Sequence, residues 1–438
     1  MSQTATTRSP LPEGTIPVGA ALLIAGVATY AFFKVGTWAV GGEDEFKTIS
    51  SLWFATFALA PGFFLPLEQE LGRALAHRRA VGHGGQPVVA RIARLAVGLF
   101  AIVLLVVLAL SPLIATHFFD GDWVMMAALV VAFAAYAPAH MARGICSGSG
   151  RFHDYAVVMG ADGVVRIALC VLLAVVGISA AGAYGFAVAL APLVGVGFVY
   201  SRGRLATAPG PEASWAEVTP NLGWLLLGSV FAATLLNAGP IATTLLASEA
   251  DDARVTQFAY GVLLARIPLF MFQAVQAALL PRLSRLAARG ELLEFRAGLK
   301  LLMMVVAAVG VVGTVGAFVL GPFVIEIVYD ADLSGRTLAM LALGSACYMV
   351  ALALAQAVIA LKGHALVSLG WITGVVAFLL ATWLSSDDLF KRVEIGLLTS
   401  SVAAMTTFAI TLRYKLASGV VPDTDSMMDA ITDMPLET

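Results

Sequence analysis

Long runs of apolar residues, separated by short polar segments, dominate the chain. A helix that crosses a bilayer needs about 20 mostly apolar residues, because the hydrocarbon core is about 30 Å thick and each helical residue advances about 1.5 Å. The pattern therefore predicts an all-α polytopic membrane protein. We expect twelve transmembrane helices, at 16–40, 48–67, 88–115, 123–145, 156–178, 181–200, 221–247, 257–280, 298–320, 336–361, 365–385 and 394–414.

The composition agrees with this class and excludes two others. Hydrophobic residues make up 60% of the 438 residues and charged residues only 12%, whereas soluble domains carry about 25% charged residues. So few charges can neither cover a water-facing surface nor keep a disordered chain in solution. The first run, 16–40, exceeds the roughly 7–15 apolar residues of a signal peptide, so we expect it to remain as a membrane helix.

Basic residues are distributed unevenly between the two sides that the twelve helices define. If the N-terminus is cytoplasmic, 18 of the 26 lysines and arginines fall in or beside inner segments. Because basic residues concentrate in cytoplasmic loops, both termini are predicted to be cytoplasmic. After Lys415 the chain has acidic residues and no basic one, so segment 415–438 is predicted to be a disordered cytoplasmic tail.

The two halves of the chain share a plan. When Pro61 is aligned with Pro268, Gln69 aligns with Gln276. Each half then holds six helices, an even number, so both halves have the same orientation and form a parallel repeat. Two such pseudosymmetric lobes with a cavity between them indicate a transporter. The predicted segments are the N-lobe at 1–200, the inter-lobe linker at 201–220 and the C-lobe at 221–414.

Prolines lie inside several of the predicted helices. Pro61 and Pro66 lie in the second run, Pro240 follows Asn237 in the seventh, and Pro268 lies in the eighth. A proline lacks an N–H and frees the carbonyl four residues earlier, which is tolerated at membrane depth where neighbours or water satisfy it. We expect interrupted helices near the interface between the lobes, with ordinary packing kinks as the alternative.

Three cations lie inside predicted helices, where a charge is costly and usually faces a cavity or a partner. Arg166 lies about 16 Å along its helix from Tyr155, and Asp162 precedes it by one turn, so a structural ion pair is one explanation. Arg266 and Lys34 have no such acid nearby, although snorkelling is an alternative for both. A surplus of cations suits an anionic substrate, since guanidinium groups bind phosphate with two hydrogen bonds.

Further residues are candidates for supporting roles. Asp162 and Asn237 are candidates for coupling transport to a cation or proton through their oxygen atoms. The alternatives are the ion pair with Arg166 for Asp162 and, more strongly, helix packing for Asn237. By pseudosymmetry, two glutamates at the end of the second run face two arginines after the eighth, which predicts an inner gate with simple solvation as the alternative. The residues of this gate are Glu68, Glu70, Arg282 and Arg285.

The sequence contains no metal-ligand cluster, phosphate-binding glycine loop or catalytic motif. We therefore expect no catalytic residue, no metal, no cofactor, no nucleic-acid partner and no enzymatic activity.

Several motifs resemble those of a known family. They are the turn Gly41-Gly42-Glu43-Asp44-Glu45-Phe46, the run from Pro61 to Glu70, the turn Gly148-Ser149-Gly150-Arg151-Phe152, and Arg266-Ile267-Pro268 followed by Pro281. Across about residues 16–414 the chain resembles the multidrug/oligosaccharidyl-lipid/polysaccharide (MOP) flippase superfamily, in particular its actinobacterial polysaccharide-export branch. The resemblance implies two lobes in a V, alternating access, and a cleft lined by the first, second, seventh and eighth helices.

The resemblance also implies a function. The expected protein is a flippase of the bacterial plasma membrane, which moves a polyprenyl-(pyro)phosphate-linked sugar from the inner to the outer leaflet for cell-envelope polysaccharide synthesis. Its partners would be the lipid-linked saccharide and glycosyltransferases, and Lys34 and Arg266 would line the cleft.

Two alternatives stay open. A cation-coupled drug or metabolite antiporter of the same fold needs intramembrane acids, for which Asp162 alone fits. A polytopic polyprenyl-sugar glycosyltransferase needs a catalytic acid or base, usually on a sizeable outer loop, and the predicted outer loops are short.

Overall fold

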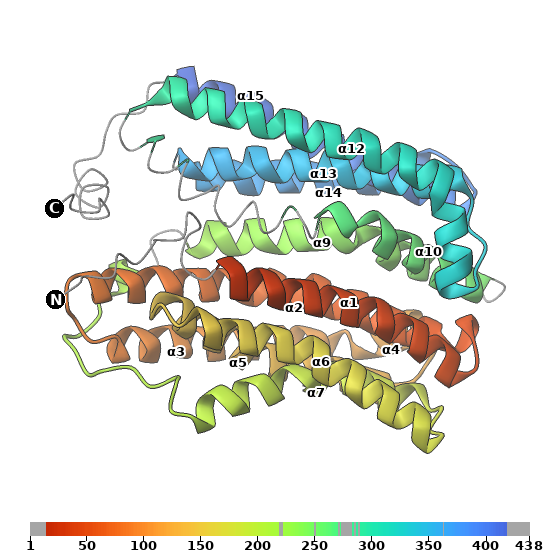
Figure 1. The fold of residues 1–438 in the computed structure, drawn as a ribbon, viewed down its shortest axis with the longest axis horizontal. Coiled ribbons are helices and arrows are strands. Elements are labelled where there is room, and N and C mark those ends of the chain that lie inside the picture. The colour runs from red at the N-terminus through yellow and green to blue at the C-terminus, as the bar shows by residue number, and fades with distance from the viewer. Residues whose placement is uncertain are drawn as a thin grey trace, which may run out of the picture.

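The computed structural model describes residues 15–218, 222–248, 251–269, 290–361 and 363–417, together with the isolated residues 272, 283, 286 and 287. All secondary structure within these residues is helical, and eleven described helices are long and apolar enough to cross a membrane. The helices lie side by side in two groups, and α1 begins at the same end of the bundle at which α15 ends (Figure 1). We call this end proximal and the opposite end distal.

The N-lobe is built on the long helix α2, which packs against α5, while α1 packs against α6 and α5 against α7. Local signals define its turns: the Asp122 carboxylate accepts the Val124 backbone N–H at 2.7 Å at the start of α5, and Gly177, with φ at 81°, ends α6. Its helices are α1 (Thr15–Val40), α2 (Glu43–Ala80), α3 (Gln86–Ala109), α4 (Ser111–Phe118), α5 (Trp123–Gly148), α6 (Phe152–Val176) and α7 (Ala181–Ser201).

The C-lobe is organised around α13 and α15. Helix α13 packs against both α12 and α15, and α14 packs against α15 and α9. The Ser334 hydroxyl caps α13 by accepting the Thr337 backbone N–H at 3.2 Å. Its helices are α9 (Leu222–Leu246), α10 (Asp252–Ala265), α12 (Leu292–Tyr329), α13 (Gly335–Ala360), α14 (His364–Leu384) and α15 (Leu389–Ala417).

The two-lobed, all-helical architecture is confirmed, but several predicted helix limits change. The predicted third helix, 88–115, is divided: α3 ends at Ala109 and α4 begins at Ser111, where Pro112 suits a helix start. Helix α12 extends well beyond the predicted 298–320. The predicted eighth helix, 257–280, is described as α10 and a short stretch at 266–269, and most of its remainder lies outside the described residues, as does the tail beyond 417.

The expected interruption of the second helix is wrong. Pro61 and Pro66 both lie within a continuous α2 of 38 residues, and Pro240 lies within a continuous α9. The loss of one hydrogen bond per proline is compatible with a continuous helix where another donor reaches the freed carbonyl. Of the four prolines, Pro268 alone follows a break, because α10 ends at Ala265.

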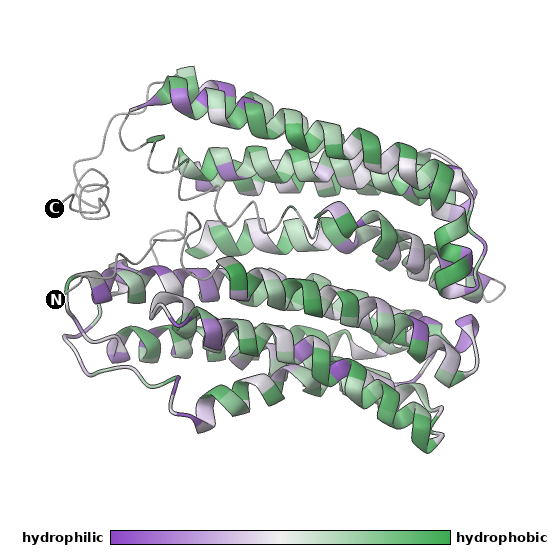
Figure 2. Ribbon diagram, viewed as in Figure 1, coloured by the Kyte–Doolittle hydropathy of each residue, from purple (hydrophilic) through white to green (hydrophobic). Residues whose placement is uncertain are grey.

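Polar residues concentrate at the helix ends, above all at the proximal end of α2 (Figure 2). The outward faces of α3 and α12 instead expose large aliphatic side chains, among them Leu105 at 67% and Val312 at 72%. Such faces are stable in hydrocarbon and not in water. The structure is thus that of a multi-pass membrane protein.

An ion pair holds the C-terminal part of the inter-lobe linker against the N-lobe. Helix α8 (Trp215–Val218) carries Glu217, whose carboxylate accepts from the Arg78 Nε at 2.7 Å. Arg78 also donates to the carbonyl of Pro211 at 2.7 Å and is buried. The hydrogen bonds from the Arg78 guanidinium to the Glu217 carboxylate lower the pKa of that carboxyl. Partial burial has a smaller, opposite effect.

We expect Glu217→Gln to lower thermal stability in detergent by about 2 kcal/mol at pH 7, since a charged hydrogen-bond partner is lost. Because the folded-state pKa is lowered, the stabilisation is complete above the unfolded pKa of about 4.3 and disappears as pH falls through the folded value. The difference between wild type and variant should therefore vanish in acid. Glu212→Gln is the matched control, since its side chain is 90% exposed beside Arg91; an equal effect there would contradict the prediction.

The lobes meet along a seam in which α2 runs antiparallel to α9 and also touches α10. From distal to proximal, the Ser51 and Thr244 hydroxyls lie 3.0 Å apart, and the Ser229 hydroxyl donates to the Pro61 carbonyl at 3.3 Å. At the distal end, Lys47 bridges the lobes by binding Asp120 at 3.0 Å and Asp252 at 2.8 Å. The Lys47 side chain is only 8% exposed, so water screens this bridge weakly.

We expect Lys47→Gln to loosen the distal end of the seam, because Asp120 and Asp252 lose their shared counter-charge. A cysteine pair at Ser51 and Thr244 should form a disulfide readily in the wild-type background and several-fold more slowly in the variant. Lys391→Gln removes an exposed distal cation that forms no described ion pair, and should leave the rate unchanged. Equal cross-linking in all three backgrounds would show that Lys47 does not hold the lobes together.

Candidate functional site

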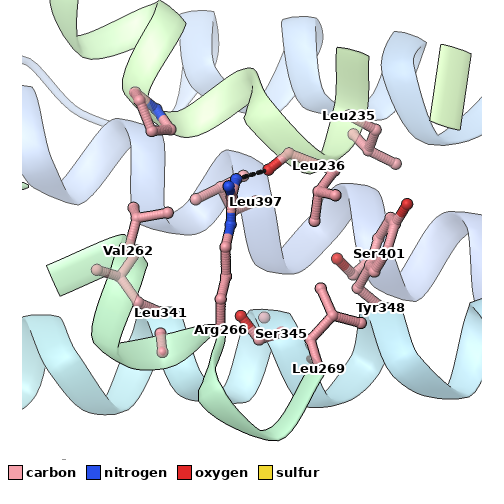
Figure 3. Close-up of a pocket in the computed structure, with 13 residues that line it drawn as sticks. Leu235, Leu236, Val262, Arg266, Leu269, Leu341, Ser345, Tyr348, Leu397 and Ser401 are labelled. Atoms are coloured by element: carbon pink, nitrogen blue, oxygen red, sulfur yellow. Dashed lines mark hydrogen bonds between the residues drawn. The ribbon is translucent and has the colours of Figure 1, made fainter. Parts of the chain in front are cut away.

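Arg266 lies at the point where α10 ends. It is the C-cap residue of α10, and Pro268, which has no N–H, cannot form the next hydrogen bond of that helix. The guanidinium turns inward and donates to the Leu236 carbonyl (Figure 3). It also donates to the Asn237 Oδ1 at 3.1 Å. The side chain is 5% exposed, and no carboxylate within the described parts of the chain forms an ion pair with it. Arg266 is therefore a buried cation without a described counter-charge.

The prolines explain why this polar site forms between apolar helices. Pro240 lacks the N–H that would bind Leu236 O, and that carbonyl accepts from Arg266 instead. Pro61 likewise frees Phe57 O, which accepts the Asn237 Nδ2 at 3.4 Å. Two carbonyls that are orphaned by proline thus anchor the polar side chains at the seam.

A cavity of about 40 Å³ adjoins the guanidinium, lined by residues of α9, α10, α13 and α15. Tyr348, Ser345 and Ser401 supply hydroxyl groups to a wall that is otherwise mostly aliphatic (Figure 3). A water molecule needs about 10–15 Å³ by this measure, so the cavity holds a few waters and no sugar or lipid head group. A larger ligand requires the lobes to move apart.

Arg166 lies on α6 in the N-lobe and is 3% exposed. It forms the predicted ion pair with Asp162, at 3.2 Å, and Asp162 also accepts from the Tyr136 hydroxyl at 3.0 Å. Even so, the Arg166 Nε and Nη1 groups and the Asp162 Oδ1 atom are buried without a described hydrogen-bond partner. The pair is neutral overall but incompletely satisfied, so its atoms remain available to water or a ligand.

Helix α2 brings these two arginines into one arrangement. Arg266 lies 5.4 Å from the ring centroid of Phe54, and Arg166 lies 5.0 Å from that of Phe57, one helical turn further along. Both contacts have cation–π geometry. Because Asn237 bonds to both Arg266 and the Phe57 carbonyl, a continuous set of contacts crosses the seam at this level. The Asn237 side-chain oxygen thus accepts a hydrogen bond from Arg266, and the predicted role of Asn237 in coupling stays a prediction.

Lys34 lies apart from this arrangement. Its side chain is exposed on α1 and does not line the Arg266 cavity. One turn before it, Tyr30 contacts the C-lobe, donating to the Leu263 carbonyl at 2.6 Å. The structure therefore brings Arg166 and Arg266 against neighbouring rings of α2, whereas the side chain of the third predicted cation is exposed.

The glutamates of the predicted inner gate have partners within the N-lobe. The buried Glu68 carboxylate interacts with the His140 Nδ1 at 2.8 Å and accepts from the Arg143 Nε and the Tyr155 hydroxyl, each at 3.0 Å. Glu70 pairs with Arg73 on its own helix. The proposed opposite side of the gate, Arg282 and Arg285, lies outside the described residues, so the gate stays a prediction.

Sequence reasoning missed the partners of Glu68 and a second buried acid. His140 and Arg143 are three positions apart on one face of α5, a spacing that could have indicated a shared partner. Glu394 begins the predicted twelfth helix and is completely buried, 3.0 Å from the Arg336 guanidinium. An acid at the limit of an apolar run resembles an ordinary interfacial residue, so the sequence alone gives no signal for its burial.

Comparison with known proteins defines the class of fold. No protein-family model matches the chain. Two proteins of Mycobacterium tuberculosis, the uncharacterized proteins Rv1510 of strain H37Rv and MT1558/MT1560 of strain CDC 1551, are each 25% identical over 392 residues, which covers 85% of this chain and 86% of theirs.

Solved structures match more extensively. A mutant of the Vibrio cholerae MATE transporter VcmN aligns over 94% of this chain and 98% of its own, with a TM-score of 0.69 and 14% identity. A multidrug resistance MATE family transporter of the MOP superfamily aligns in its inward-facing form over 91% of this chain and 98% of its own, with a TM-score of 0.70 and 13% identity. Its outward-facing form covers 92% and 96%, with a TM-score of 0.67 and 13% identity. The chain therefore has the two-lobed fold of MATE transporters.

Proposed function

We propose that the protein is a membrane transporter, and specifically a flippase for a polyprenyl-(pyro)phosphate-linked sugar or oligosaccharide. It would carry this lipid from the inner to the outer leaflet of a bacterial plasma membrane, with both termini cytoplasmic, for cell-envelope polysaccharide synthesis. The observation that carries the proposal is Arg266, a buried cation at the lobe seam that no described carboxylate neutralises. A phosphate group is a chemically suitable counter-charge.

In this mechanism the seam opens from one side at a time. Separation of the lobes exposes Arg266, whose planar guanidinium exchanges the Leu236 carbonyl and Asn237 for phosphate oxygens. Arg166, which contacts Phe57 one helical turn from Phe54, has N–H groups without a described partner near the same level of the membrane. The apolar tail stays in the bilayer, so only the phosphate and sugar need polar contacts during transfer. Glycosyltransferases that make and use the lipid are the proposed partners.

A cation-coupled drug or metabolite antiporter of the same fold is the second candidate. Asp162 favours it, because this acid lies within a membrane helix and its Oδ1 is buried without a described partner. A carboxylate in that position could take up a proton or cation during transport. Glu394 adds a second buried acid, in the C-lobe.

Reconstitution separates the two functions. Purified protein in liposomes is supplied with a fluorescent polyprenyl-phosphate sugar, and the fraction accessible to an external quencher is followed over time. In parallel, the same vesicles are tested for uptake of a cationic drug under a proton or sodium gradient. We expect lipid transfer without drug uptake. Drug uptake without lipid transfer would reject the flippase and establish the antiporter.

A further inference from the structure

A second apolar cavity lies on the membrane-facing side of the C-lobe, near its distal end. It has a volume of about 470 Å³ and lies between α9 and α14. Its walls include Ala238, Ala242 and Leu245 of α9 and Phe378 and Leu379 of α14. Leu245 and Leu379 are 45% and 60% exposed, so the cavity is a groove that opens toward the lipid. It shares only Leu235 with the lining of the Arg266 cavity.

The groove matches the depth of one leaflet. Its α9 wall runs from Thr234 to Leu246, which is about 18 Å at 1.5 Å per residue. Half of a hydrocarbon core is about 15 Å. Trp383, 84% exposed, stands at the distal mouth, where aromatic side chains mark the membrane interface. A single chain lying in the groove would therefore place its head group at the distal surface.

The mouth of the groove carries an arginine with spare hydrogen-bonding capacity. Within the described residues, Arg392 donates only to the Leu246 carbonyl, at 3.3 Å, and its Nε is buried without a partner. Thr382 also lines the groove, but its hydroxyl is buried against Gly396 of α15 and does not face the mouth. Two nearby arginines differ, since Arg254 pairs with Asp251 at 2.8 Å and Arg336 with Glu394 at 3.0 Å.

We propose that this groove binds a lipid with one long apolar chain and a phosphate head group, taken from the leaflet at the distal end. Arg392 binds the phosphate, and the α9–α14 groove holds the chain. The head group is anionic because Arg392, the cation that lines the groove, has no described carboxylate partner. The groove, of about 470 Å³ between two adjacent helices, takes a single chain, and a one-chain lipid leaves no second chain outside it. The site does not depend on what the Arg266 cavity transports.

Binding to the full-length protein in nanodiscs tests this site. The probes are a polyprenyl monophosphate, the uncharged polyprenol of equal length, two-chain phosphatidylglycerol and inorganic phosphate, with retention measured by native mass spectrometry. All proteins carry Arg266→Ala, so that the central cavity cannot supply the guanidinium. We expect the polyprenyl phosphate to be retained at least tenfold better than each other probe.

Three variants locate the contact. Arg392→Gln should weaken retention of the polyprenyl phosphate about tenfold and leave the weak retention of polyprenol unchanged. Ala242→Leu, which narrows the groove, should weaken retention of both. Lys391→Gln is the matched control, since it removes the neighbouring exposed cation and should change retention less than twofold.

Two results would overturn the proposal: retention of the polyprenyl phosphate by Arg392→Gln equal to that of the Arg266→Ala parent, or retention of phosphatidylglycerol equal to that of the polyprenyl phosphate. The flippase assay is independent, because failed transfer with intact Arg392-dependent binding would reject the proposed transport and leave this site standing.

Discussion

Arg266→Ala is expected to reduce the initial rate of lipid-linked sugar transfer in liposomes about 30-fold. The variant loses charged hydrogen bonds of about 2 kcal/mol, and each 1.4 kcal/mol corresponds to a factor of about ten. Arg266→Lys should lose less, about fivefold, because an ammonium keeps the charge but not the fork that binds two phosphate oxygens. The quencher assay on reconstituted protein measures both rates.

The matched control is Arg254→Ala, on the same helix. Arg254 is 43% exposed and already pairs with Asp251, so its loss should leave transfer unchanged. Unaltered transfer in Arg266→Ala, with normal gel-filtration behaviour, would exclude Arg266 as a phosphate contact. Equal loss in both arginine variants would indicate a general effect of charge on vesicle behaviour.

Glu68→Gln is expected to destabilise the N-lobe by about 3 kcal/mol, because breaking a buried ion pair leaves the other charge uncompensated. Arg143 is 16% exposed and relies on the Glu68 carboxylate, which is itself 7% exposed. The amide also has fewer acceptor sites for His140, Arg143 and Tyr155 than the carboxylate has. Thermal unfolding in detergent, followed by circular dichroism, measures the loss.

Glu70→Gln provides the comparison for this effect. Glu70 is buried to a similar degree, but its partner Arg73 is 51% exposed and keeps access to water. We expect a loss below about 1 kcal/mol, as for exposed ion pairs. If both substitutions lower the free energy of unfolding equally, the contacts of Glu68 with His140, Arg143 and Tyr155 would not specifically stabilise the N-lobe. That result would favour the inner-gate interpretation of both glutamates.

The sequence was sufficient to predict most helices, because a run of about 20 apolar residues has few structural options in a bilayer. The Asp162–Arg166 pair was equally accessible, since both partners lie on one helix. Long-range partners were not accessible. The pairing of Glu68 with α5 depends on which faces of two distant helices meet, and apolar periodicity does not encode this within a buried bundle.

The prolines show the same limit in another form. Pro61 and Pro240 indicated correctly that carbonyls would be freed, but not that α2 and α9 would continue through them. Their outcome depended on donors elsewhere in the chain, Asn237 and Arg266, which bind the freed carbonyls in the folded protein. Lys34 is exposed on α1 and does not line the Arg266 cavity, so its predicted place in the cleft stays a prediction.

The continuity of α2 has a mechanical consequence. A helix of 38 residues is about 57 Å long at 1.5 Å per residue, almost twice the thickness of the hydrocarbon core. This single rod carries Lys47 near its distal end, Phe54 and Phe57 within its distal half, and Glu68 and Arg78 in its proximal half. A tilt of a few degrees about its centre displaces both ends in opposite directions. Loosening at one membrane surface would thereby tighten contacts at the other, and a rigid lever of this kind keeps both surfaces from opening together.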